Sequence, residues 1–439
     1  PTQTMPPEPG SPALGAGDWA AASQFTTDQR GFPRAVSDNV DIGSVEIQPG
    51  QAYCIVVNAA NSGPGSLRQV VSNAPPNATI TFDPGLSGQI ITLDSGQIVL
   101  SSNLTIDASG LPYGLVINGH HASRIFTINN GATVNLVSLV LYNGYATNSY
   151  GGAVSNGPSS TAVIVNCLVI SNSADIYGGG IVNNGIIYLN NSTLAGNHAG
   201  EFGGGLNNDG SVVFKQCTFT GNSALTGGGA LSSGGAVNLI QSTLTGNSTS
   251  GFAGGIHSGG AGTLSISNSI VAGNNAANKP DLDSAYTGVT NLIGGTAQLA
   301  ALGYYGGPTP TMPPLPGSPV IAAGNAGIAT GLGNDQRGFP RIVGGQTDLG
   351  AVELQSPPAN PPVLENAVWY GGGGGAGAFQ FTMSSAPGAD FTVLSATNVA
   401  LPLTNWTVLG EVMQPLPGQY QFVDPGATNA VRFYRVRSP

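Results

Sequence analysis

Charge is the scarcest property of this chain. Asp, Glu, Lys and Arg supply 7% of its residues, and the 11 basic residues are scattered except for a small cluster in the last few positions. With a net charge of −10, the chain offers no basic surface for nucleic acid or an anionic membrane, so we expect neither as a partner. No apolar run is long enough to span a bilayer, so membrane insertion is not expected, and we recognise no signal peptide.

Cysteine is also scarce, with Cys54, Cys167 and Cys217 as its only representatives. Cys167 and Cys217 fall two repeats apart in the solenoid derived below, which separates them by about 9 to 10 Å from strand spacing alone. That distance exceeds the reach of a disulfide. We therefore predict no disulfide, and interpret the cysteines as small buried side chains.

Glycine is abundant, at 68 of 439 residues, and the tract 151–274 runs five times through one pattern of a glycine cluster, a short strand and a step ending in Asn. A fixed period of this length indicates a repeat architecture. The repeated Asn residues, with spacings of 25, 25, 25 and 27 by subtraction, are Asn172, Asn197, Asn222, Asn247 and Asn274.

Within each repeat apolar residues alternate, as at Val212 and Phe214, and no helical stripe is present. The predicted fold class is all-β, a parallel β-helix with one coil per repeat. In this fold the five Asn side chains stack into a ladder of amides, and the paired glycines allow positive φ at the opposite corner. A second column should hold only small side chains: Cys167, Ser192, Cys217, Ser242 and Ser269.

The first 50 residues repeat residues 308–357 without a gap, at a constant offset of 307, and segment 28–34 (DQRGFPR) is identical to 335–341. Either the chain is part of a longer tandem array, or this N-terminal arm presents a cap-like surface to the open end of its own or another solenoid. The repeated charges are Asp28, Arg30, Asp335 and Arg337. We interpret them as an Asp-started turn whose Arg holds a carbonyl or carboxylate at the solenoid's end, with ligand binding as the alternative.

Residues 61–69 (NSGPGSLRQ), 80–83 (ITFD) and 104–107 (LTID), the glycine/Asn repeats and the DQRGFPR segment resemble secreted bacterial right-handed parallel β-helix proteins of the choice-of-anchor Q domain type. These are similar to polymorphic outer-membrane-protein repeats. The resemblance covers roughly 51–354 and again 1–48. It implies an extracellular or cell-surface protein and no defined enzyme activity. Residues 62–71 also predict a short helix over the first coil.

Residues 355–362 form a Pro-rich linker. Residues 363–439 alternate in the β manner and predict a small β-sandwich. Through residues 405–410 (NWTVLG) and 432–436 (RFYRV), this part resembles a C-terminal domain common on secreted bacterial proteins. The predicted organisation is an arm (1–50), a solenoid (51–354), the linker and the sandwich.

Few residues in the repeats carry chemistry. Asp175, His198 and Glu201 fall on adjacent turns and form a weak candidate catalytic or metal-binding cluster, for which a solvated corner is the alternative. No nucleophile elbow or phosphate loop is present, so we predict no catalytic residue, metal ligand or cofactor.

The leading functional hypothesis is an extracellular structural or adhesive surface protein that associates with itself, head to tail, into a filament through its arm and solenoid ends. One alternative is a module that binds surface glycans on an exposed stripe of Tyr142, Tyr145, Tyr150 and Tyr177, since aromatic faces suit sugars. Another is a polysaccharide-degrading enzyme that uses Glu201.

Overall fold

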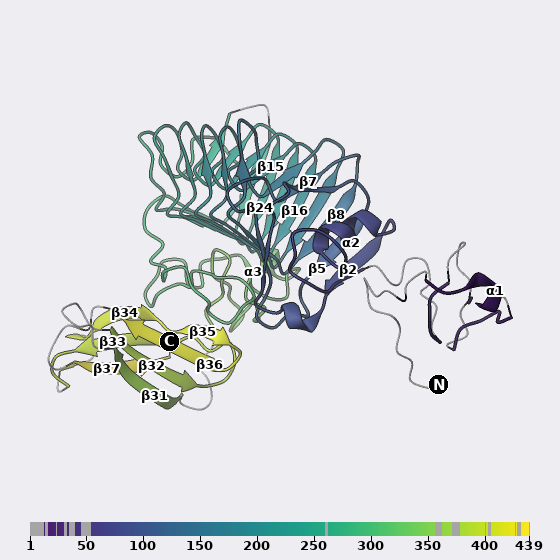
Figure 1. The fold of residues 1–439 in the computed structure, drawn as a ribbon. Helices are drawn as coiled ribbons and strands as arrows, with labels where there is room; N and C mark the ends of the chain where they lie inside the picture. Colours follow the sequence, from purple (N-terminus) through teal and green to yellow (C-terminus); the bar gives the residue numbers. More distant parts are fainter. Residues whose placement is uncertain are drawn as a thin grey trace.

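The computed structural model describes residues 13, 16–22, 24–29, 33–34, 40–44, 54–259, 262–355, 362–370, 378–399, 401–402, 405–425, 427 and 432–438. Its regular secondary structure is almost entirely strand, arranged as a parallel β-solenoid and a smaller antiparallel domain (Figure 1). The all-β solenoid fold predicted from the repeat is therefore confirmed. None of the helices in these residues is long and apolar enough to cross a membrane.

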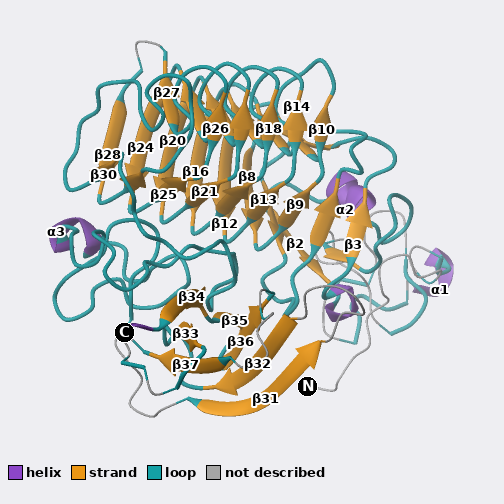
Figure 2. Cartoon of the chain, turned by 90° about the vertical axis from the view of Figure 1, so that its left-hand side faces the viewer, coloured by secondary structure: helices purple, strands orange, loops and turns teal. Residues whose placement is uncertain are grey.

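The coils contribute short strands to four parallel sheets (Figure 2). The first contains β1 (Ile55–Val56), β2 (Ala78–Phe82), β5 (Leu104–Asp107), β8 (Thr133–Val137), β12 (Thr161–Val165), β16 (Ile186–Asn190), β20 (Ser211–Lys215), β24 (Ala236–Ile240) and β28 (Leu264–Ser267). The second contains β3 (Ile90–Thr92), β6 (Val116–Asn118), β9 (Val140–Tyr142), β13 (Leu168–Ile170), β17 (Thr193–Ala195), β21 (Thr218–Thr220), β25 (Thr243–Thr245), β29 (Ile270–Val271) and β30 (Leu292–Ile293). The third contains β10 (Tyr145–Ala146), β14 (Ser173–Ala174), β18 (His198–Ala199), β22 (Ser223–Ala224) and β26 (Ser248–Thr249). The fourth contains β4 (Ile98–Leu100), β7 (Phe126–Ile128), β11 (Val154–Asn156), β15 (Ile181–Asn183), β19 (Leu206–Asn208), β23 (Leu231–Ser233) and β27 (Ile256–Ser258).

The repeat fixes the register, so that Ile187 lies beside Val212, and Val212 beside Val237. These side chains point into one apolar core that runs along the solenoid, whereas the alternating Tyr188 is 42% exposed. The period of two in the sequence is thus the alternation between core and solvent.

Helix α2 (Leu67–Asn73) covers the first coil. Ser66 begins it by accepting a hydrogen bond from the Gln69 amide, and Leu67, Val70 and Val71 are buried in the solenoid core. The helix hides the open edge of the first coil, as the sequence predicts. A short 3-10 turn, η1 (Pro84–Leu86), follows β2.

The two glycines of each pair are required for different physical reasons. Gly178 has a φ of 63°, in the left-handed region. At Gly179 a Cβ would lie 2.2 Å from the carbonyl oxygen of His198 and 2.6 Å from that of Gly204. The first glycine therefore allows the corner, and the second allows the coils to stack.

The C-terminal domain has two antiparallel sheets, with strand orders β31-β32-β36-β35 and β34-β33-β37. Its strands are β31 (Val363–Tyr370), β32 (Ala378–Ser384), β33 (Thr392–Ala396), β34 (Thr407–Glu411), β35 (Met413–Leu416), β36 (Gln419–Asp424) and β37 (Phe433–Arg437). Phe381, Phe391, Tyr420 and Phe422 pack between the sheets. This is the predicted sandwich, with β31 and β35 as additions.

Candidate functional site

The predicted Asn residues form a continuous ladder of hydrogen bonds. Asn197 donates from both its backbone amide and Nδ2 to Oδ1 of Asn222, at 3.0 and 2.8 Å. Asn222 does the same to Asn247, at 3.1 and 2.9 Å. The last amide, Asn274, donates to the carboxylate of Asp281, which ends the ladder.

A second buried ladder was missed from the sequence. Nδ2 of Asn156, Asn183 and Asn208 donates to the side chain of the next coil, at 2.8, 2.7 and 3.0 Å, and the ladder ends at Ser233. The signal was a spacing of 27, 25 and 25 residues by subtraction, which the neighbouring glycines and serines obscure. The cysteine column is present too, with the Cys217 amide donating to Oγ of Ser242. All three cysteines are free and buried.

We call residues 308–354 the closing module. This module lies along the outward face of the second sheet, and we call that face the flank. Two polar columns of the flank meet it. One is the threonine column, Thr193, Thr218 and Thr243, which are paired residues of β17, β21 and β25. The other is the corner column, Gln216, Gln241 and Asn268, each with positive φ. All six are buried.

Gln336 is the central contact on the flank. Its Nε2 donates to Oγ1 of Thr193 at 2.8 Å, and its Oε1 accepts from Thr218 at 2.6 Å, so one amide spans two adjacent coils. Thr193 donates in turn to the carbonyl of Pro310 at 2.7 Å. Gln216 of the corner column donates to the carbonyl of Asn334.

The rest of the closing module continues along the same columns. Arg341 donates to Oε1 of Gln241 at 2.6 Å, and the Ala351 amide donates to Oγ1 of Thr243 at 3.0 Å. Leu349 packs with Ile270 in a small apolar cluster. The closing module therefore covers the side of the solenoid, and the end position that we expected for its charges is wrong.

The paired charges of this module make a joint to the sandwich. Arg337 is fully buried and donates to Oδ2 of Asp335 at 3.0 Å and to Oδ1 of Asp390 at 2.7 Å. It also donates to the carbonyl of Glu353 at 2.6 Å. Burial alone would lower the pKa of Arg337, but the two carboxylates outweigh it and raise that pKa.

The N-terminal arm reproduces the internal structure of the closing module, 307 positions earlier. Helix α1 (Trp19–Ala22) corresponds to α3 (Ala326–Ala329), and the bridge from Thr27 to Pro33 corresponds to that from Asn334 to Pro340. The matching backbone bonds are Gly17 to Val40 with Gly324 to Thr347, Gln29 to Ser44 with Gln336 to Ala351, Arg34 to Thr26 with Arg341 to Gly333, and Ile42 to Ala13 with Leu349 to Val320. Asp28 is buried like Asp335, and Arg30 lies outside the described residues.

The arm differs from the closing module at its docking face, which we define as Gln29, Ile42 and Ser44, the residues whose counterparts contact the flank. Figure 1 shows α1 standing apart from the solenoid, whereas α3 lies close to it. Gln29 and Ser44 are exposed, and Ile42 is 56% exposed. Their counterparts Gln336, Ala351 and Leu349 are all buried on the flank.

The three residues of the weak candidate cluster have different partners. Asp175 accepts hydrogen bonds from the Asn148 amide at 2.7 Å and the Tyr145 hydroxyl at 2.6 Å, and these lower the pKa of its carboxyl. Nδ1 of His198 lies 2.9 Å from Oγ of Ser223 on the next coil. Glu201 lies near Tyr177, and burial together with this carboxylate raises the pKa of that phenol. The three stay a weak candidate for catalysis, and the described residues hold no group of three such side chains placed for a metal.

Aromatic side chains stack along one corner of the solenoid. The ring centroids of Tyr150 and Tyr177 are 5.3 Å apart, and those of Tyr177 and Phe202 are 5.9 Å apart. His257 continues the row, 5.5 Å from Phe202, and its Nδ1 lies 2.5 Å from Asp283. Tyr150 and Tyr177 are stacked with an interplanar angle of 18°, whereas Tyr177 and Phe202 are tilted by 51°, and Tyr150 remains 42% exposed.

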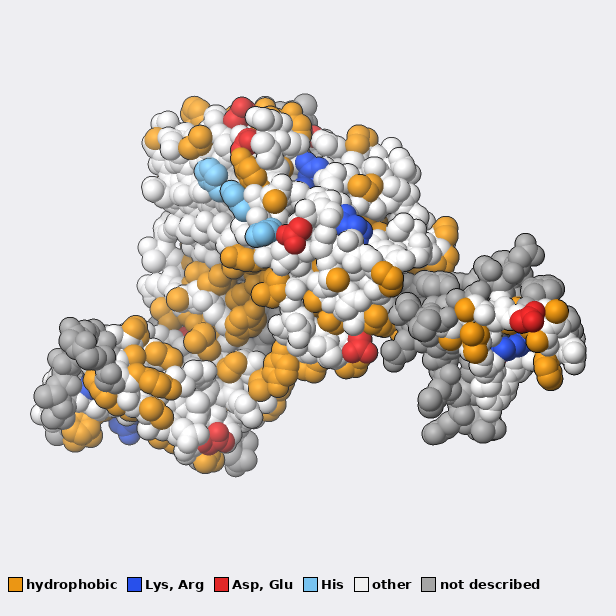
Figure 3. Space-filling model, in the orientation of Figure 1, with side chains coloured by type: hydrophobic (Ala, Val, Ile, Leu, Met, Phe, Trp, Pro, Cys, Tyr) orange, Lys and Arg blue, Asp and Glu red, His pale blue; other side chains and the backbone are white. Residues whose placement is uncertain are grey.

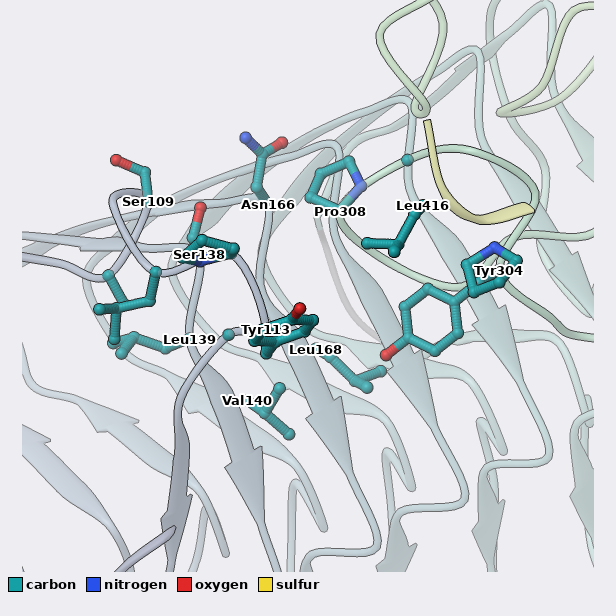
Figure 4. Close-up of a pocket in the computed structure, with 16 residues that line it drawn as sticks. Ser109, Tyr113, Ser138, Leu139, Val140, Asn166, Leu168, Tyr304, Pro308 and Leu416 are labelled. Carbon is teal, nitrogen blue, oxygen red and sulfur yellow. The ribbon is translucent and has the colours of Figure 1, made fainter. Parts of the chain in front are cut away.

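A groove of about 480 Å³ continues the flank beyond the closing module (Figure 4). Val140 and Leu168, which align with the threonine column, form its floor, and Tyr113, Tyr304 and Leu416 line its sides. Figure 3 shows apolar side chains gathered between the solenoid and the sandwich. The closing module thus begins where the column turns from apolar to polar.

One buried carboxyl should make the sandwich sensitive to pH. Burial raises the pKa of Glu411 from its ordinary 4.5 to about 8, although Thr392 donates a hydrogen bond to it at 2.7 Å. Because the pKa of Glu411 is higher in the folded chain, its protonated carboxyl contributes its full stability below pH 4.5. This contribution is lost as the pH rises through about 8.

We therefore expect Glu411→Gln to raise the free energy of unfolding at pH 9, on the order of a few kcal/mol, and the melting temperature with it. Both should change little at pH 5. The exposed Glu365→Gln is the matched control in the same domain. Thermal unfolding followed by circular dichroism at both pH values measures this, and equal effects of Glu411→Gln at pH 5 and pH 9 would contradict it.

Comparison with known proteins gives no relative. The chain matches no protein-family model, and no curated protein or solved structure shows a significant similarity to it. Fold and contacts define it as a parallel β-solenoid with a docked closing module, a second copy of that module at its N-terminal side and a C-terminal sandwich.

Proposed function

We propose that this protein is an extracellular structural or adhesive surface protein that associates with itself head to tail through its N-terminal arm. The observation that carries the proposal is the arm, which is folded as a second closing module while its docking face is exposed. A surface-bound or secreted bacterial setting rests on the sequence resemblance. The low charge of the solenoid and its rigid ladders suit a structural role.

Sedimentation velocity of the full chain tests this proposal. The native chain is expected to form species larger than a monomer, and Gln29→Ala is expected to shift them toward the monomer. Gln24→Ala, an exposed glutamine of the same arm, is the control and should change nothing. A native chain that stays monomeric at all concentrations, or assemblies that persist in a folded chain without residues 1–50, would overturn the role of the arm.

A second candidate function is glycan binding at the aromatic corner. Tyr150 is 42% exposed, and ring faces of this kind stack on sugars. Tyr150 ends the stacked row and offers one outer face. A glycan array tests this candidate: a specific glycan should bind the native chain and be lost in Tyr150→Ala, and an array without binding would exclude it.

A further inference from the structure

We propose that the N-terminal arm docks on the flank of a second β-solenoid, across a threonine column like the one that the closing module covers here. The proposal rests on the proposed function, because it names the surface that the arm would engage. It replaces the solenoid end with the solenoid side as the place of contact.

The arm is already shaped for this contact. The bond from the Gln29 amide to the Ser44 carbonyl, at 2.9 Å, matches the bond from Gln336 to Ala351, at 3.0 Å. The Gln29 side chain therefore has the same position within the arm that Gln336 has within the closing module, and Gln336 uses that position to bind two threonines. Because the internal hydrogen bonds form without a solenoid, little ordering remains to oppose docking.

Three features of the arm match three features of a flank. The Gln29 amide can span two hydroxyls on adjacent coils, as Gln336 does. The backbone amide of Ser44 corresponds to that of Ala351, which donates to Thr243. Ile42 corresponds to Leu349, which packs with Ile270.

This pattern identifies the partner by its chemistry. Hydroxyls repeated at the spacing of neighbouring parallel strands, about 4.8 Å, occur where equivalent coils stack. The partner is therefore a solenoid flank with an open threonine column. In a second copy of this chain the column already holds a closing module, which Arg337 ties to Asp390, so that copy must first release it.

A tandem chain provides the test without this competition. Residues 51–307 are placed directly ahead of the full chain, so that the arm follows a leading solenoid in the register of 308–357. The Gly43 and Ser44 amides correspond to those of Gly350 and Ala351, which donate to Asn268 and Thr243. We expect hydrogen exchange at the Gly43 and Ser44 amides to slow by at least ~100-fold relative to the native chain. Gln29→Ala should reverse most of this protection, and Gln24→Ala should not.

Unchanged exchange at Ser44 in a tandem chain whose leading solenoid is folded would overturn the proposal. If the leading solenoid does not fold, a full chain whose residues 308–357 carry the sequence of residues 1–50 tests the same contact. The amide at position 351 should then be protected from exchange. Exchange at position 351 as fast as at Ser44 of the native chain would overturn the proposal.

The two proposals fail separately. A protected arm in the tandem chain, with a native chain that remains monomeric, would support flank docking and reject self-association. Assembly of the native chain with an unprotected arm in the tandem chain would do the reverse.

Discussion

Replacing Arg337 with alanine is expected to lower the free energy of unfolding by about 3 to 5 kcal/mol. Arg337 is the buried cation between Asp335 and Asp390, and its removal leaves both carboxylates without their charged partner. Because Asp390 belongs to the sandwich, the variant should also loosen the docking of that domain. Urea unfolding measures the first effect, and limited proteolysis between the solenoid and the sandwich measures the second.

Arg435→Ala is the matched control, since Arg435 is an exposed cation on the sandwich strand β37. It should change stability by less than about 1 kcal/mol. Combining Arg337→Met with Asp335→Asn and Asp390→Asn should restore much of the loss, because no buried charge then remains unpaired. An Arg337→Ala variant as stable as Arg435→Ala would contradict the joint described above.

Replacing Asn222 with alanine should be nearly as costly, at roughly 3 kcal/mol or more. Its Oδ1 accepts two hydrogen bonds from Asn197, and its Nδ2 donates to Asn247 and to the carbonyl of Leu194 at 2.9 Å each. The variant leaves several buried polar groups without partners at a position that water does not reach. Chemical denaturation followed by far-ultraviolet circular dichroism measures the loss.

Asn238→Ala tests whether the ladder position matters, since Asn238 is a half-buried residue of strand β24 outside both ladders. We expect this change to remain below about 1 kcal/mol. Equal losses from Asn222→Ala and Asn238→Ala would mean that the ladder adds nothing beyond ordinary packing.

Repetition is what made the solenoid predictable from sequence. Asn222 has an Asn counterpart in each of the five repeats, Cys217 belongs to a column of small side chains, and the alternation of Val212 and Phe214 marks the inward face. The second ladder escaped because Asn208 is followed by Ser233, which breaks the identity of the column. The resemblance to bacterial surface proteins stays a prediction.

The docking of the closing module was not predictable in the same way. No sequence pattern links Thr218 to Gln336, and only the folded chain shows that they bury each other. The duplication indicated that residues 1–50 and 308–357 share a structure, and it carried no information about the surface they cover. Strand β31 was missed because its eight residues are all exposed and show no alternation of burial.

We expect the arm to join copies of this chain head to tail, and electron microscopy of the native protein at low micromolar concentration tests this self-association most directly. We expect regular fibres whose axial repeat is one solenoid with its sandwich. These fibres should disappear in Gln29→Ala and persist in Gln24→Ala. Single elongated particles from the native chain, or fibres that survive Gln29→Ala unchanged, would contradict it.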